Sequence, residues 1–373
     1  MASSAQKQHQ HLPKIYSTTS APPPTPSSHT HHVTSAADAD ALSRLLHRLP
    51  PTLSLPTRRS TPATSPPVVS LSDPNSSDLL LSASSQLGFF QVTDHDIPSQ
   101  IAKSSESESL SLFQLTRDKK ESYFPENWPL GFEDDEDGKS ESFWLDANCS
   151  PGSTELKLSS LHELTRALEK VGLEIIEMLS REVGFENPLK EDPTRICSLM
   201  LVHEGSYEDK PAISGGFYPY IVGLQYQIRS HKYSLLADSG WVAVQPQADS
   251  VMVTVGDIAQ VWSNGRLKKV RGRPLACMGE GKNSSSISMT LLVTLPTEST
   301  VSPLLPKPII NEENANNESE VAEEVEEASH GIGSNSKEEG RLFSSFSFED
   351  YAWRVYHEPL LLKDPLDKYR IIN

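Results

Sequence analysis

The stretch VMVTVGDIAQVWSNGRLKKV, residues 251–270, decides the fold of this chain. Valines alternate through its first five residues before Gly256-Asp257, and a second apolar run, Ile258–Trp262, ends at Ser263-Asn264-Gly265. Alternation with a period of two is typical of half-buried strands. Asn-Gly is a strong turn signal because both residues tolerate a positive φ. The stretch therefore predicts two strands joined by tight turns.

Further motifs lie on both sides of this stretch. They are Trp241-Val242-x-Val244-x-Pro246, LGFFQVTDHDIP at Leu87–Pro98, FEDY at Phe348–Tyr351 and DPLDKYR at Asp364–Arg370. With V-x-x-G-D-x-x-Q-x-x-S-N-G-R-x-K-x-V at 253–270, they resemble the plant Fe(II)/2-oxoglutarate-dependent oxygenases of the isopenicillin N synthase-like type. The resemblance covers residues 65–305 and 343–373. It implies a mainly β fold with flanking α-helices, built on a double-stranded β-helix, or jelly-roll, barrel.

That family holds Fe(II) with a His-x-Asp pair on one strand and a second His about fifty residues further on, a facial triad. Placed on the family's motifs, this chain has Tyr220 and Val222 for the pair and Gly272 for the second His. The resemblance implies that these three positions converge on one point inside the barrel. Ser286 replaces the arginine that grips 2-oxoglutarate, and Ser288 retains that motif's serine as a weak cofactor-binding candidate.

The positions of the histidines in the chain, considered without any alignment, also indicate that the triad is missing. The chain has 12 histidines, and none is followed two positions later by Asp or Glu. No histidine lies between His231 and His330, where the second ligand would fall. Losing one outer-shell partner lowers metal affinity by about 10- to 100-fold, so losing all three ligands should lower it by well over ~10³. We expect no metal ligand, no catalytic residue and no bound cofactor.

Aromatic and apolar side chains stand where the ligands would be. Tyr220 would fill the vacated volume and Val222 would extend an apolar lining, with Tyr218 and Tyr226 nearby in the sequence. Two interpretations stay open. The barrel is repacked as plain core, or these four residues form a remodelled pocket for a small apolar metabolite.

The resemblance leaves two hypotheses of function. The preferred one is a 2-oxoglutarate/Fe(II) dioxygenase-like protein that is catalytically inactive and has a scaffold or small-molecule-binding role. The alternative is an active oxygenase that uses Fe(II) and 2-oxoglutarate to hydroxylate a plant hormone of the gibberellin type or a secondary metabolite.

Composition excludes several classes of protein. The net charge of −17 argues against a nucleic-acid surface. No apolar run approaches the roughly 18 residues of a membrane span. The three cysteines lie far apart without a C-x-x-C spacing, which indicates reduced thiols in an intracellular protein. We expect the cytoplasm, with the plastid as the alternative because the first 65 residues are rich in Ser and poor in acids.

The chain divides into five expected regions. They are a disordered low-complexity segment 1–65, an N-terminal α/β region 66–190, the barrel 191–305, an acidic disordered insertion 306–342 and a C-terminal helix region 343–373 that packs on the barrel. The insertion is a candidate for binding a protein partner, with a solvating linker as the alternative.

Three local features complete the expectations. Residues 126–153 are interpreted as a surface loop that contains a strand at Trp144-Leu145-Asp146. Ser160-x-x-Glu163 is typical of a capping box, and opens a helix that Gly184 ends. His95 is expected to be a hydrogen-bonded turn residue, followed by Asp96 where the family has Gly.

Overall fold

The computed structural model describes residues 63–134, 140–153, 155–190, 196–205, 217–276, 286–306, 342–357 and 364–371. The chain divides into two units, Met1–Ser60 and Thr61–Asn373, and every described residue lies in the second. The expected disordered segment 1–65 and the acidic insertion 306–342 lie almost wholly outside the described residues. Their boundaries stay predictions.

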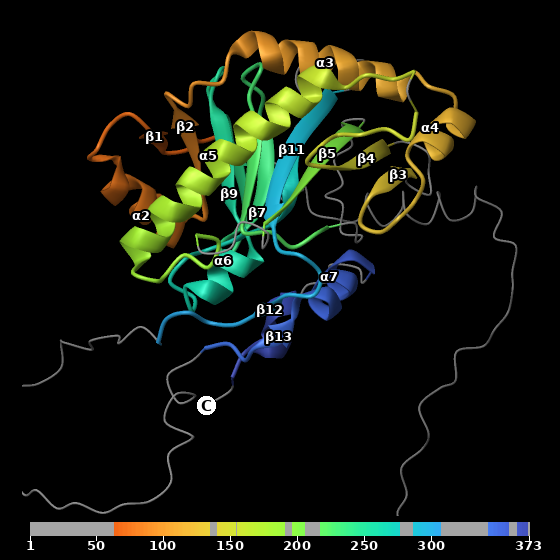
Figure 1. The fold of residues 1–373 in the computed structure, drawn as a ribbon. Helices are drawn as coiled ribbons and strands as arrows, with labels where there is room; N and C mark the ends of the chain where they lie inside the picture. Colours follow the sequence, from red (N-terminus) through yellow and green to blue (C-terminus); the bar gives the residue numbers. More distant parts are fainter. Residues whose placement is uncertain are drawn as a thin grey trace, which may run out of the picture. The chain divides into compact units, whose positions relative to one another are not determined.

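The described part is built on a sheet of eight strands in the order β1-β2-β9-β6-β11-β5-β4-β3 (Figure 1). Its strands are β1 (Val68–Ser70), β2 (Phe89–Thr93), β3 (Gly131–Asp134), β4 (Ser140–Asp146), β5 (Cys197–Gly205), β6 (Val222–Tyr226), β9 (Val251–Val255) and β11 (Ser286–Thr294). Only β1 and β2 are parallel among the paired strands of this sheet in the described residues. The regions 66–190 and 191–305 therefore share one sheet.

A second sheet of three strands has the order β10-β7-β8. Its strands are β7 (Tyr233–Ala237), β8 (Gly240–Val244) and β10 (Val270–Ala276), and the short strands β12 (Thr300–Val301) and β13 (Phe346–Ser347) pair separately. An apolar cluster that includes Phe89 and Met252 of the large sheet and Leu235 and Val270 of the small one packs the two sheets together. The predicted mainly β fold is confirmed.

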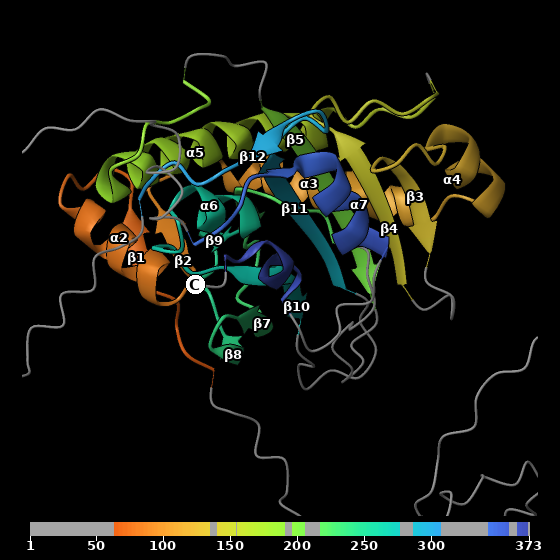
Figure 2. The ribbon, with the colours of Figure 1, turned by 90° about the horizontal axis from the view of Figure 1, so that it is seen from below.

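Helices surround the large sheet on its other face and at one end. They are α2 (Ser76–Gln86), α3 (Ser99–Phe113), α4 (Arg117–Tyr123), α5 (Ser159–Val183), α6 (Asp257–Trp262) and α7 (Phe348–His357), with a 3₁₀ helix η2 (Pro365–Tyr369). Figure 1 shows α3 and α5 lying across the sheet, whereas α6 and α7 lie at one end of it, as Figure 2 shows from below. Within the described segments, no helix combines the length and apolar character that crossing a membrane requires.

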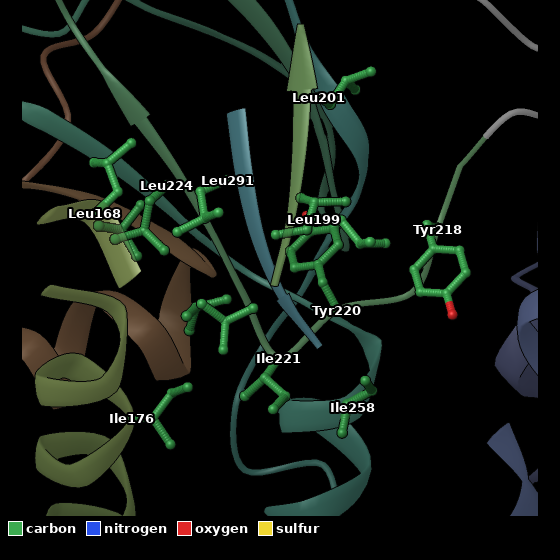
Figure 3. Packing of buried hydrophobic residues seen from close by; sticks show 14 of the residues in the cluster. Leu168, Ile176, Leu199, Leu201, Tyr218, Tyr220, Ile221, Leu224, Ile258 and Leu291 are labelled. Carbon is green, nitrogen blue, oxygen red and sulfur yellow. The ribbon is translucent and has the colours of Figure 1, made fainter. Parts of the chain in front are cut away.

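The contact between α5 and the sheet shows which way β6 faces. A Cβ atom on Gly172 of α5 would lie 3.0 Å from Leu224 and 2.9 Å from Val293, so the helix backbone touches these two side chains. In Figure 3, Leu224 and Leu291 point toward Leu168 of α5. Since side chains alternate along a strand, the even-numbered residues of β6 face the helices and the odd-numbered ones face the small sheet.

The start of α5 differs from its prediction. The helix begins at Ser159 after Leu158, and no side chain of the predicted capping box caps it. Instead Glu108 of α3 accepts hydrogen bonds from the backbone N–H groups of Ser160 (3.0 Å) and Leu161 (2.9 Å). A carboxylate at a helix N-terminus also meets the positive end of the helix dipole. The capping-box prediction was wrong, because Glu108, which is distant in sequence, accepts the hydrogen bonds from the first N–H groups of α5 instead.

The second apolar run of the opening stretch forms a helix, not the predicted strand. Ile258–Trp262 belongs to α6, and all five of its side chains are buried. An apolar run without periodicity does not distinguish a buried strand from a buried helix. The turn that follows is as predicted, since Asn264 and Gly265 have φ angles of 50° and 82°.

The predicted surface loop 126–153 is largely sheet. Strands β3 and β4 pair with each other, and β4 also pairs with β5. Phe143 and Trp144 are 0% and 3% exposed, so the predicted strand is longer than expected and central to the core. The turn at His95 is confirmed, since Nδ1 accepts from the N–H of Ile97 at 3.1 Å. Asp96 adopts the left-handed conformation there, with φ 58°.

A buried charge cluster holds the C-terminal segment on the barrel. Lys269, just before β10, is fully buried, and its Nζ lies 2.5 Å from Oδ1 of Asp257 and 2.7 Å from Oδ1 of Asp364. Asp364 also accepts from the N–H of Leu366 at 3.0 Å, which starts η2. Arg271 adds a second cation 3.7 Å from Oδ2 of Asp364. Asp364 therefore links the last described segment to the barrel.

Asp364→Asn is expected to lower the free energy of unfolding at neutral pH by about 3 kcal/mol. This value is the lower end of the cost of breaking a buried ion pair, because Asp257 still compensates the charge of Lys269 in the variant. Burial raises the pKa of the Asp364 carboxyl, but Lys269 and then Arg271 lower it further, and its pKa lies below the ordinary value. Such a carboxyl adds stability above its ordinary pKa that is lost as the pH falls through the folded pKa. Urea unfolding from pH 7 to pH 3 should show the difference between parent and variant shrinking with acid.

The matched control is Asp367→Asn, three residues further on. Asp367 pairs with Arg370 on the surface, where both side chains are about half exposed, and such pairs contribute about 0–1 kcal/mol. Equal losses in both variants would contradict the anchoring role of Asp364.

Candidate functional site

The segment just before β6 is fixed between the end of β11 and the start of α6. The N–H of Ile221 donates to Val293 O at 2.8 Å, and the N–H of Gly256 donates to Ile221 O at 2.9 Å. The hydroxyl of Thr294 donates to Pro219 O at 2.7 Å. These bonds set the position of Tyr220, which lies between two anchored residues.

Gly256 is needed because the backbone of Tyr220 passes against it. A Cβ atom on Gly256 would lie 2.0 Å from Tyr220 O and 2.5 Å from Tyr220 Cδ2. The same carbonyl accepts from the N–H of Ile258 at 3.2 Å, in the first turn of α6. The glycine of the Gly-Asp motif thus marks a place where two backbone segments meet.

The hydroxyl of Tyr220 is buried and surrounded by oxygen atoms. Its Oη lies 3.1 Å from Val270 O, 3.2 Å from Gly272 O and 3.2 Å from Thr254 Oγ1. A phenol has one proton to donate, so the two carbonyls share it and Thr254 can donate to Oη. Figure 3 shows Tyr220 on the side of the sheet away from α5. Two of the three predicted ligand positions, Tyr220 and Gly272, therefore meet.

Burial raises the pKa of Tyr220 well above its ordinary value. The phenol is therefore neutral at physiological pH, with its proton directed at backbone carbonyls. Iron binds to phenolate, the anionic form, and this environment disfavours that form.

Phe217 occupies the space beside Gly272. A Cβ atom on Gly272 would lie 2.4 Å from Cε1 and 2.5 Å from Cζ of Phe217. Gly272 has φ 71°, a left-handed backbone conformation that residues other than glycine rarely adopt. It lies where the pairing of β10 with β7 shifts register, between Arg271 and Leu275. Both the space and the backbone therefore exclude a histidine here.

Val222 does not join the other two positions. It is fully buried and pairs with Val255 and Val293. It shares a strand face with Leu224, which contacts α5. The chain bends at Ile221 before β6 begins, so Tyr220 and Val222 face opposite sides of the sheet.

The four residues proposed as a pocket lie in separate surroundings. Tyr218 packs against Trp128 and Phe348, with ring centroids 5.7 and 5.8 Å away. Tyr226 donates to Oδ1 of Asp249 at 3.1 Å, and burial raises its pKa to about 12. With Tyr220 at the small sheet and Val222 under α5, the structure does not bring the four together.

Ser288 lies in β11 opposite His203 of β5, and His203 lies opposite Ser142 of β4. Ser142 Oγ is 3.0 Å from His203 Nδ1, so the three form a polar row across neighbouring strands. Ser286 lies two residues before Ser288, opposite Gly205. Sequence reasoning missed Ser142, and it also missed Phe217 and Thr254, because their spacing carries no motif.

Comparison with known proteins agrees with this architecture. The family model of the 2OG-Fe(II) oxygenase superfamily matches residues 209–294. Gibberellin 2-beta-dioxygenase 2 of Arabidopsis thaliana is 27% identical over 270 residues, which are 64% of this chain and 76% of that protein. The chain is thus similar to 2OG-Fe(II) oxygenases in the family-model match and in the sequence of this relative.

Solved structures of the superfamily share the fold. JOX2 in complex with 2OG, Fe and JA superposes with a TM-score of 0.60 at 17% identity, over 83% of this chain and 90% of that one. The dioxygenase for auxin oxidation in rice has a TM-score of 0.59 at 17% identity, over 82% of this chain and 100% of that one. The predicted double-stranded β-helix is confirmed.

The superfamily implies an iron centre, and the residues present at its expected place do not fit one. A neutral phenol, a threonine hydroxyl and two backbone carbonyls meet there, whereas the superfamily's iron takes two histidines and a carboxylate. Among the residues that the structure describes, no three His, Cys, Asp or Glu side chains could hold a metal ion together.

Gly272→Ala is expected to lower the free energy of unfolding by about 2–5 kcal/mol, the sum of a left-handed backbone penalty and overpacking against Phe217. Chemical denaturation measures the change. Gly184→Ala is the matched control, because Gly184 also has a left-handed φ (90°) but nothing lies within 4 Å of its Cβ position. Adding Phe217→Ala to Gly272→Ala should recover the overpacking part. A loss no larger than that of Gly184→Ala would mean that Phe217 does not fill this space.

Proposed function

We propose that this protein is a dioxygenase-like scaffold that does not carry out the Fe(II)/2-oxoglutarate reaction. One observation carries the proposal. The hydroxyl of Tyr220 donates its hydrogen bond to the carbonyls of Val270 and Gly272, and the ring of Phe217 fills the space beside Gly272. The expected metal place is thus filled by packed side chains.

The residue types expected to contact 2-oxoglutarate support the same proposal. The superfamily's R-x-S motif places a guanidinium on a carboxylate, which gives two parallel charge-assisted hydrogen bonds. Here Ser286 stands for the arginine, and a serine offers one neutral hydroxyl. Ser288 alone retains the motif, so binding of 2-oxoglutarate would lose its principal charge partner.

The alternative is an active oxygenase that hydroxylates a gibberellin-like hormone or a secondary metabolite. The similarity to a gibberellin 2-beta-dioxygenase favours it. It would need iron ligands other than those at Tyr220, Val222 and Gly272, from parts of the chain beyond the described residues or by a rearrangement of this site.

The two non-catalytic roles are a scaffold and a binding protein for a small metabolite, and we favour the scaffold. Tyr218, Tyr220, Val222 and Tyr226 face different surroundings, which leaves an apolar metabolite without a shared lining. The proposed partner surface is the acidic insertion 306–342, which lies outside the described residues. For the compartment we propose the cytoplasm, since Cys149 and Cys197 are free thiols.

Anaerobic titration of the purified protein with Fe(II) and 2-oxoglutarate tests the absence of the reaction. We expect no stoichiometric binding of either, and no succinate above the level without protein when oxygen is added. Stoichiometric iron, or succinate that rises with protein concentration, would contradict the proposal and favour the active oxygenase.

Replacing 308–340 by a short Gly/Ser linker is expected to leave the melting temperature within about 2 °C of the parent, because loop length enters stability only logarithmically. The residues flanking the insertion are already fixed at one turn. The N–H of Leu304 donates to Trp262 O at 3.0 Å, and that of Leu342 donates to Asn264 Oδ1 at 2.8 Å. Differential scanning calorimetry measures the change, and a fall of many degrees would show that the insertion packs on the barrel.

A further inference from the structure

We propose that the hydroxyl of Tyr220 is a latch that holds the small sheet in register against the large one, at the place where the superfamily's metal would join them. The inference goes beyond the proposed function, because it concerns what keeps the barrel closed and not which reaction is absent. It predicts a local mechanical role that can be measured without iron or substrate.

The first step concerns the two sheets. The large and the small sheet have separate hydrogen-bond ladders in the described part of the chain. The cluster of Phe89, Met252, Leu235 and Val270 packs them together, but hydrophobic contact is non-directional. Packing alone therefore does not fix where β10 lies along the large sheet, so directional bonds must do so. Gln225 Nε2 of β6 donates to Tyr233 Oη of β7 at 3.3 Å, and Lys269 holds the start of β10 to Asp257 of α6, whereas the Tyr220 hydroxyl binds the backbone of β10 itself.

The second step concerns β10 itself. It is an edge strand of the small sheet, so one side of its backbone has no partner strand among the described residues. Buried backbone carbonyls need hydrogen-bond partners. Tyr220 supplies one donor to two carbonyls, those of Val270 and Gly272, and both carbonyls therefore lie on the side of β10 that faces Tyr220.

The third step concerns the large sheet. Tyr220 leads directly into β6, and its hydroxyl also meets Thr254 of β9 at 3.2 Å. Both strands are central in the large sheet. One buried hydroxyl thus joins β6 and β9 to β10. In the superfamily a metal bound by His-x-Asp and a later His would make the same connection.

Hydrogen exchange of the full chain with Tyr220→Phe tests the latch. The ring stays, so packing is kept, and only the hydroxyl is lost. We expect the amides of β10 and β7 to exchange at least about fivefold faster than in the parent, the ratio that one net hydrogen bond corresponds to. The amides of β5 and β11, which lie in the large sheet away from Tyr220 Oη, should be unchanged.

Tyr226→Phe is the matched control, because its hydroxyl is bound to Asp249 and not to the small sheet. It should leave β10 and β7 as in the parent. If Tyr220→Phe does not fold, Thr254→Val takes its place, since it removes the hydroxyl that supports Tyr220 Oη and should give the same selective rise at smaller size. Unchanged exchange in β10 and β7, a rise equal across both sheets, or the same rise in Tyr226→Phe would overturn the latch.

Discussion

The close passage of residues 217–220 through the barrel constrains the rest of the structure. It brings backbone against Gly256 and an aromatic ring against Gly272, and neither glycine could carry a Cβ atom without a shift. The two glycines belong to different motifs, yet both make room for the same segment, residues 217–220. Because both contacts are made by packed atoms, neither glycine can be replaced by a residue with a larger side chain unless this segment moves.

The electrostatics of the interior separate into two kinds of buried polar group. Tyr220 is neutral, and its bonds are to neutral oxygens, so the barrel centre carries no formal charge. Lys269 is charged and fully buried, but two carboxylates compensate it. An unpaired buried charge would be far more costly than either arrangement. The charges around Lys269 thus lie at the C-terminal contact, and a second ion pair, buried Lys120 with Glu141, lies between α4 and β4, whereas the groups around Tyr220 Oη are neutral.

The sequence predicts the parts of this fold that local periodicity governs. The strand Val251–Val255, the apolar stripe of α5 and the Asn264-Gly265 turn all form as expected, although the strand is buried on both faces and not on one. It fails where a partner distant in sequence decides the structure. Glu108 replaces the expected cap of α5. The buried run Ile258–Trp262, whose pattern fits a strand and a helix equally well, forms a helix.

The candidate site shows the same limit. Motif spacing locates Tyr220 and Gly272, and the structure places them within hydrogen-bond reach. Motif spacing did not predict where Val222 lies. A bend at Ile221 places Val222 on the face of the sheet opposite to Tyr220, although the two residues are only two positions apart. Phe217 has no motif at all, although its ring decides what residue 272 can be. Spacing along a strand predicts direction only where the strand is regular.

β10 is where the two buried networks meet. Lys269 binds Asp364 through its side chain, and the next residue, Val270, accepts from Tyr220 through its carbonyl. Arg271 faces Asp364 again, and Gly272 faces Tyr220 again. Successive residues of one short strand thus alternate between the C-terminal segment and the barrel centre. Substitutions at residues that contact one another or share a backbone segment commonly have non-additive effects on the free energy of unfolding. We therefore expect Asp364 and Tyr220, which both bind residues 269–272, to be energetically coupled through this stretch.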